Sequence, residues 1–231
     1  EKAAEEVKPS HVEMVLVLDE SGSMSNLTND TIGGFNSMIE KEKKLDVDAH
    51  VTTVLFNDQY KMLYNRRELK DVRKMTDKDY TPGGMTALLD AVGRTIHKMD
   101  MVSGIHRKDK GNKVLFVIIT DGEENDSKEY TYADVKKLIK DRQENAGWEF
   151  IFLGANIDAA AAAENLGIDR DRAVKYKNTG SGVRANFKAV AELSDSLAKS
   201  GRVSDEWKET VEKDEDDAAD KQSAAVTLHR R

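Results

Sequence analysis

The segment Val12–Leu18 reads VEMVLVL and runs directly into the polar loop Asp19–Ser23, which reads DESGS. Similar apolar runs occupy residues 113–119 and 148–153, and segments with helical periodicity separate the three runs. Short apolar runs arranged in this way are typical of strands that are buried on both faces of a parallel sheet. The sequence therefore predicts an α/β fold.

Further segments complete the predicted fold. Residues 51–56 and 60–64 are strand-like and are joined by three turn-forming residues, which predicts a hairpin and one antiparallel edge strand. A short strand around residues 174–176 would form the opposite edge. Apolar stripes at helical spacing occupy residues 32–39, 88–99, 132–142, 158–166 and 183–197. We expect a doubly wound, Rossmann-like, mostly parallel six-stranded sheet with one antiparallel edge strand and helices on both faces.

Composition excludes several classes of function. The chain has 231 residues and a net charge of −7, and it contains no cysteine, so disulfides, thiolate metal sites and cysteine nucleophiles are absent. Nine acids and two lysines between residues 204 and 220 account for the whole imbalance, and a neutral body argues against nucleic-acid binding. The longest apolar run, residues 114–119, is too short for a membrane span.

The charge pattern also suggests how the chain is organised. We expect a flexible lead-in at residues 1–10, one domain over residues 11–200 and an acidic tail over residues 201–231 that is partly helical or disordered. Trp207 and Val211 are spaced for a short helix that docks on the domain. The absence of cysteine favours the cytoplasm, with secretion as the alternative.

Oxygen-bearing side chains follow the predicted strands where ligands bind in doubly wound sheets. Asp19, Ser21 and Ser23 follow the first strand, Asp121 follows the strand at 113–119, and Thr86 follows a Gly-Gly loop and opens a helix. Carboxylate and hydroxyl oxygens suit a hard divalent cation. Each loop taken alone also fits an ordinary turn or helix cap.

Together, the three loops resemble the von Willebrand factor A family with its metal-ion-dependent adhesion site: Asp-x-Ser-x-Ser, a distant Thr and a distant Asp-Gly. The resemblance implies that Mg²⁺ or Mn²⁺ binds Ser21 and Ser23 directly, Thr86 directly or through water, and Asp19 and Asp121 mostly through water. It also implies that a partner carboxylate fills the sixth position. Residues 24–27 lack the acid pair that builds a second metal site in integrins, so we expect no such site.

The resemblance thus implies a protein-binding module rather than an enzyme. Bacterial and phage relatives of this stand-alone type often work with ATPases or assembly components, which suggests a partner of that kind. We expect the rim that contacts the partner to contain Glu20, Met24, Met85, Glu123 and Glu124. The alternatives are a metal-assisted hydrolase with Glu20 or Glu123 as general base, and a structural module whose metal site is vestigial.

Overall fold

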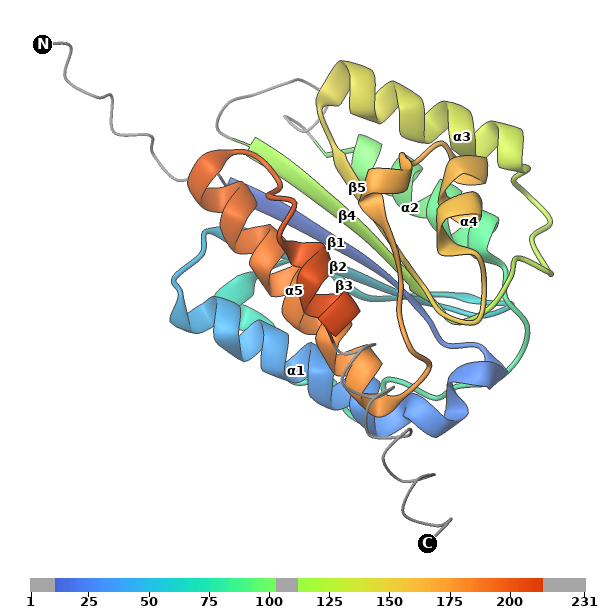
Figure 1. Ribbon diagram of the computed structural model, residues 1–231, viewed down its shortest axis with the longest axis horizontal. Coiled ribbons are helices and arrows are strands. Elements are labelled where there is room, and N and C mark those ends of the chain that lie inside the picture. Colours follow the sequence, from blue (N-terminus) through green and yellow to red (C-terminus); the bar gives the residue numbers. More distant parts are fainter. Residues whose placement is uncertain (1–10, 103–111, 214–231) are drawn as a thin grey trace, which may run out of the picture.

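The computed structural model describes residues 11–102 and 112–213 (Figure 1). The expected lead-in and the acidic segment from residue 214 onward lie outside the described residues. The described chain forms a six-stranded sheet in the order β3-β2-β1-β4-β5-β6. The strands are β1 (His11–Asp19), β2 (Ala49–Phe56), β3 (Tyr60–Glu68), β4 (Asn112–Thr120), β5 (Glu149–Gly154) and β6 (Ala173–Lys175).

All neighbouring strands are parallel except the β2–β3 hairpin, so the predicted fold class is confirmed. The chain builds outward from β1 to β3 on one side and then crosses to β4, which pairs with the other side of β1. The strand order therefore reverses between β1 and β4. Leu18 pairs with Ile119 in this register, so the loops after the two strands begin at the same level.

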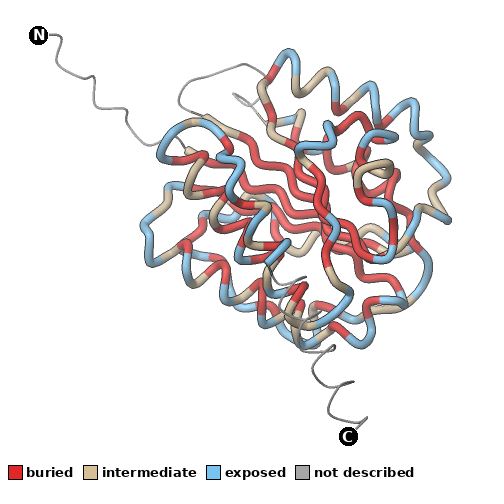
Figure 2. Tube along the Cα trace, in the orientation of Figure 1, coloured by how far each residue is buried: buried red, intermediate tan, exposed pale blue. Residues whose placement is uncertain are grey.

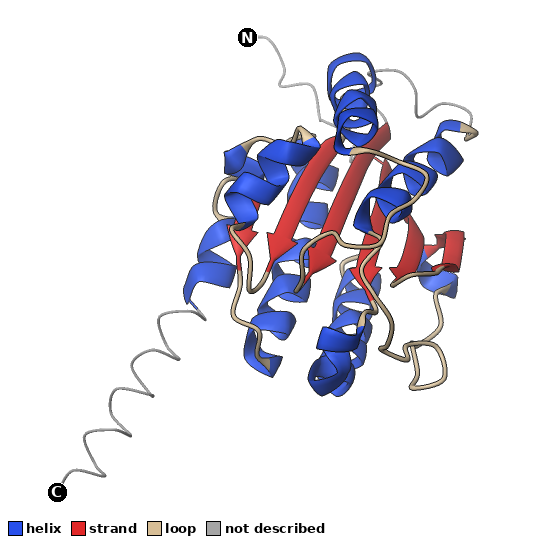
Figure 3. Cartoon of the chain, turned by 90° about the vertical axis from the view of Figure 1, so that its right-hand side faces the viewer, coloured by secondary structure: helices blue, strands red, loops and turns tan. Residues whose placement is uncertain are grey.

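Helices α1 to α5 cover the two faces of the sheet (Figures 1 and 3). One hydrophobic cluster joins the sheet to α1 and α5, and the other joins it to α2, α3 and α4. Figure 2 shows that the central strands β1, β2, β4 and β5 are buried almost throughout, while the helices expose their outer sides. The helices are α1 (Thr28–Lys44), α2 (Leu88–Asp100), α3 (Tyr132–Asp141), α4 (Ala159–Leu166) and α5 (Gly180–Ser200).

Local signals explain where several helices begin and end. Thr131 and Asp134 form a reciprocal capping box at the start of α3, which satisfies two backbone N–H groups that have no partner within the helix. Gly167 ends α4 in the left-handed conformation, with a φ of 87°. The π-helical turn Arg142–Ala146, which continues α3, was not expected from the sequence pattern.

The body of the protein continues beyond the boundary expected at residue 200. Residues 207–213 are helical, and the side chains of Trp207 and Val211 are buried in the cluster that contains α1 and α5. The first part of the predicted tail therefore belongs to the domain core. In the described ranges, no helix has both the length and the apolar character needed to cross a bilayer.

Candidate metal centre at the carboxyl ends of the strands

The predicted ligands meet where the strand order reverses. The Oγ atoms of Ser21 and Ser23 lie 3.1 Å apart, and the Ser23 hydroxyl donates to Oδ1 of Asp121 at 2.5 Å. A Cβ atom added at Gly122 would lie 3.6 Å from the Thr86 hydroxyl and 4.0 Å from that of Ser23. Three separate loops thus bring their oxygens to one point above the β1–β4 junction.

Asp19 lies beneath this point and is almost completely buried. Its Oδ1 accepts from the backbone N–H of Ser21 at 2.7 Å, and its Oδ2 accepts from the Thr120 hydroxyl at 2.6 Å. Burial raises the pKa of Asp19, and the nearby charge of Asp121 raises it further. Because both oxygens already accept hydrogen bonds within the protein, Asp19 is placed to shape the site from below.

A network of backbone bonds fixes Thr86. Gly22 N–H donates to the carbonyl of Gly84 at 3.2 Å, which joins the first loop to the Gly-Gly loop. Asn125 accepts from Thr86 N–H through its side chain at 2.9 Å and donates its own N–H to the Thr86 carbonyl at 3.0 Å. Gly84 has a φ of 75°, and a Cβ there would collide with the Asp58 carboxylate, so the loop requires glycine at that position.

The donor set fits a hard divalent cation. It consists of hydroxyl and carboxylate oxygens, and it offers neither nitrogen nor sulfur. Asp19 and Asp121 are both buried, yet among the described residues neither forms an ion pair with Lys, Arg or His. Two buried carboxylates without a cationic side chain form a site whose charge a metal ion would balance.

Two residues of the expected rim are buried instead. Glu20 is 4% exposed, and its Oε1 accepts from Thr81 N–H at 2.5 Å and from Lys61 Nζ at 3.2 Å. These bonds tie the first loop to β3 through Lys61 and to the segment after β3 through Thr81, so Glu20 is neither a rim residue nor a free general base. Met24 is 2% exposed and packs in the core, because it lies on the inner side of the short helix Gly22–Leu27.

Glu124 also has a structural role rather than a free surface position. Its carboxylate accepts from Leu89 N–H at 3.0 Å and from Ser127 N–H at 2.7 Å, so it holds the first turn of α2 against the loop after β4. Of the five expected rim residues, Met85 and Glu123 remain exposed. The solvent-facing rim is therefore smaller than the sequence indicated.

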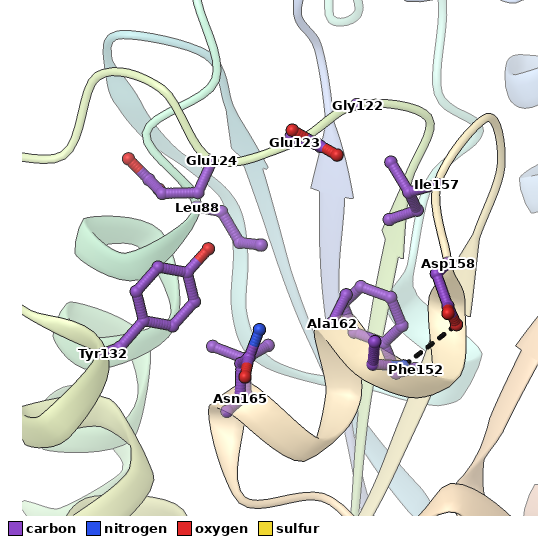
Figure 4. Close-up of a pocket in the computed structure, with 12 residues that line it drawn as sticks. Leu88, Gly122, Glu123, Glu124, Tyr132, Phe152, Ile157, Asp158, Ala162 and Asn165 are labelled. Carbon is purple, nitrogen blue, oxygen red and sulfur yellow. Dashed lines mark hydrogen bonds between the residues drawn. The ribbon is translucent and has the colours of Figure 1, made fainter.

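A pocket of about 250 Å³ adjoins the metal face at Gly122. Leu88, Phe152 and Ile157 give it apolar walls, and Figure 4 shows Glu123 and Tyr132 beside it. The pocket lies between the loop after β4 and α4. It offers room for a side chain next to the metal face.

Sequence reasoning missed three residues that support the site. Thr120 holds Asp19, Asn125 holds Thr86, and Asn178 donates its side-chain N–H to Oδ2 of Asp121 at 3.3 Å. Thr120 and Asn125 flank the Asp-Gly pair, so their position in that loop was a usable signal. Asn178 follows β6, and only the assembled sheet brings it to Asp121.

Residues 11–174 match a family model described as the vWA found in the TerF C terminus. The chain belongs to this vWA-TerF-like family. No curated protein matches the chain. The predicted membership of the vWA family is confirmed.

Solved vWA structures share the fold at low sequence identity. A von Willebrand factor type A protein from Catenulispora acidiphila is 14% identical with a TM-score of 0.54, and the match covers 80% of this chain and 43% of that one. The pilus adhesin SpaC from Lactobacillus rhamnosus GG is 14% identical with a TM-score of 0.64, over 84% of this chain and 31% of SpaC.

A third solved structure of the same fold was determined with a metal ion bound to that protein. Proximal thread matrix protein 1 from the mussel byssus, solved with a zinc-occupied MIDAS motif, is 13% identical with a TM-score of 0.54. The match covers 80% of this chain and 46% of that protein. The chain thus spans less than half the length of these three structures, and the likeness establishes the fold alone.

Proposed function

We propose that this vWA domain binds Mg²⁺ or Mn²⁺ and uses the ion to engage a carboxylate of a partner protein. The hydroxyls of Ser21, Ser23 and Thr86 would hold the ion, and Asp19 and Asp121 would act mostly through water. The observation that carries the proposal is the convergence of the Ser21 and Ser23 hydroxyls with Asp121 at 3.1 and 2.5 Å.

The charges of the donors explain why such a site would attract an anion. If neutral hydroxyls contact the ion directly, the ion keeps most of its positive charge for an incoming ligand. Mg²⁺ takes six oxygen ligands and retains waters readily, so a partner carboxylate can replace a water. The buried carboxylate of Asp19 balances the charge from below, where it is already held by Ser21 and Thr120.

The exposed residues beside the metal face indicate which side chains a partner would need next to its carboxylate. Glu123 and Met85 are exposed at the metal face, and the pocket beside Gly122 has apolar walls. We therefore expect the partner carboxylate to be flanked by Lys or Arg and by an apolar side chain. An ATPase or an assembly component is the kind of partner we propose. Among the named neighbours, SpaC is a pilus adhesin and the byssus protein is a matrix protein.

The hydrolase alternative has lost one of its two candidate bases, because Glu20 is buried and bonded to Thr81 and Lys61. Glu123 is exposed on the metal face and is the remaining candidate. vWA domains are generally protein-interaction modules, which favours binding over hydrolysis as the proposed role.

Calorimetric titration with Mn²⁺ tests the metal site. Ser23→Ala removes an exposed hydroxyl of the site. Ser25→Ala is the matched control because Ser25 is exposed on the same short helix and its hydroxyl donates to the Gly22 carbonyl, away from the site. We expect wild type and Ser25→Ala to bind one ion, and Ser23→Ala to bind at least tenfold more weakly. Equal affinity in all three proteins would contradict the proposed site.

The same variants test the partner. In the presence of Mg²⁺, we expect affinity capture with wild type to recover a partner protein, and we expect that recovery to be lost in EDTA or with Ser23→Ala. Glu123→Lys should weaken binding of the same partner. Glu144→Lys is the control, because Glu144 is also exposed. Recovery that is indifferent to chelator and to Ser23→Ala would exclude a metal-bridged contact even if Mn²⁺ binds.

A further inference from the structure

A second cluster of metal-ligating side chains lies at the opposite end of the sheet. In the parallel register of β1 and β2, Glu13 is the direct neighbour of His50. His11 precedes Glu13 by two residues on β1, so its side chain points to the same face of the sheet. The three side chains therefore gather at the amino ends of the strands, away from Ser21, Ser23 and Thr86.

The three potential ligand atoms have the spacing of a tetrahedral zinc site. His11 Nε2 lies 2.9 Å from His50 Nδ1 and 3.4 Å from Glu13 Oε1, and His50 Nδ1 lies 3.2 Å from the same oxygen. Zinc bonds of about 2.0–2.1 Å at tetrahedral angles place ligand atoms about 3.3 Å apart. The three measured distances lie within 0.4 Å of that value.

A neighbouring carboxylate sets the tautomer that His11 needs in order to bind a metal through Nε2. Asp48 Oδ1 lies 3.0 Å from Nδ1 of His11, so that nitrogen carries the proton and Nε2 offers its lone pair. A carboxylate that orients a histidine in this way is the usual outer partner of a zinc ligand. Nδ1 of His50 lies 2.9 Å from Nε2 of His11, so the two nitrogens can share a proton or can bind one metal ion between them.

Arg66 supplies a competing positive charge. Its guanidinium binds Glu13 through Nε at 3.1 Å and through Nη2 at 2.5 Å, and Nη2 also lies 3.3 Å from His50 Nδ1. Arg66 is aimed there by an irregular β2–β3 pairing, where it has a φ of 45° and its N–H donates to the Thr52 hydroxyl. The Nη2 group reaches the two ligand atoms that a metal would share, so the guanidinium must turn aside for the ion.

We propose that His11, Glu13 and His50 form a second metal site that binds one Zn²⁺ through two nitrogens and one oxygen, with Asp48 orienting His11 and Arg66 as a displaceable counter-cation. His11 and His50 also line a cleft, together with Asp48, Glu68 and Lys70, through which an ion and water can reach the two histidines. The site would tie β1 to β2 at their amino ends. It is independent of the proposed function of the metal centre at the other end.

Cobalt and zinc titrations of the full chain test this site, with Ser23→Ala as the background so that metal uptake by the first metal centre is weakened. We expect one equivalent of Co²⁺ to give the intense visible absorption of tetrahedral coordination, and one equivalent of Zn²⁺ to remove it. His50→Gln should abolish that absorption. His97→Gln is the control, because His97 is an exposed histidine on α2 outside the cluster.

Two further variants separate a metal site from a purely structural ion-pair cluster. Asp48 has a side chain that is 76% exposed, so Asp48→Asn should fold normally and weaken zinc binding about tenfold. Arg66→Gln removes the competing cation and should tighten zinc binding. A cluster that serves only as an ion pair would bind no zinc in any of these proteins, and that result, or an unchanged cobalt spectrum in His50→Gln, would overturn the proposal.

Discussion

Glu42 is a single acid whose ionisation opposes folding. It lies on α1 with its side chain completely buried against α5, and its Oε2 accepts from the Ser194 hydroxyl at 2.8 Å. Within the described residues its Oε1 has no hydrogen-bond partner. Burial therefore raises the pKa of Glu42 to about 7, although the Ser194 hydroxyl works in the opposite direction.

This shift predicts that the protein loses stability as the pH rises. A carboxyl with a folded-state pKa of about 7 against an ordinary value of 4.5 binds its proton more tightly in the folded chain, so its contribution is complete below pH 4.5 and is lost as the pH rises through 7. Glu42→Gln should raise the free energy of unfolding at pH 8 by roughly 1–3 kcal/mol relative to wild type, and by much less at pH 5. Thermal melts at the two pH values measure the difference. An equal effect at both would show that Glu42 does not titrate in this range.

The convergence of the candidate ligands could be predicted from the sequence, whereas the direction of the neighbouring side chains could not. Asp19, Ser21 and Asp121 follow apolar runs, and the ends of parallel strands share one edge of a sheet, so their convergence follows from the pattern. Glu20 and Met24 occupy the same loop but turn inward, because Glu20 finds Thr81 N–H and Met24 finds the core. The direction of a loop side chain depends on partners that lie far away in the sequence.

At the scale of secondary-structure elements, the packing of α1 against α5 depends on Gly34, which is one of two adjacent glycines in α1. A Cβ atom at Gly34 would lie 2.5 Å from the ring of Phe187 on α5, whereas a Cβ at Gly33 would meet nothing within 4 Å. The packing constraint thus applies to Gly34 alone, and the surface that Gly34 meets belongs to a helix.

The glycine pair gives a matched prediction. Gly34→Ala should lower the free energy of unfolding by about 1–2 kcal/mol, because displacing an aromatic ring in the core costs more than the gain in helix propensity. Gly33→Ala should raise it by about 0.5–1 kcal/mol, since alanine restricts the unfolded chain and meets no obstacle. Denaturant unfolding of both variants measures the signs. Two changes of the same sign would contradict the packing described here.

Secondary structure was predictable where it depends on local pattern. The hairpin at residues 57–59, the capping box at Thr131 and the glycine stop at Gly167 all lie where the sequence indicated. The cluster of His11, Glu13 and His50 was not, because 37 residues separate Glu13 from His50 and only the register of β1 with β2 joins them. Local sequence patterns therefore predict helices, strands and turns. A side-chain cluster such as this one depends on the register between two strands, which a local pattern does not determine.

For the molecule as a whole, the two proposed metal sites lie at opposite ends of β1. His11 and Asp19 are its first and last residues, so the sites are about 26 Å apart at the usual rise per residue of a strand. Perturbations at such a distance usually add in free energy when they share no partners. The donor sets also differ, because one site offers only oxygens and the other offers two imidazoles, which favour zinc over Mg²⁺.

The stabilisation that one metal site provides in thermal melting should therefore be independent of the stabilisation that the other site provides. Mg²⁺ at 100 times its measured dissociation constant should stabilise wild type and His50→Gln by about 2.7 kcal/mol, or roughly 5–10 °C, and should stabilise Ser23→Ala by no more than about 1.4 kcal/mol. Zn²⁺ should still stabilise Ser23→Ala, and its effect should be smallest in the Ser23→Ala, His50→Gln double variant. Differential scanning calorimetry measures all four proteins. If His50→Gln removed the Mg²⁺ shift, the two ends of the sheet would be coupled through β1, and the additivity argued from their separation would be wrong.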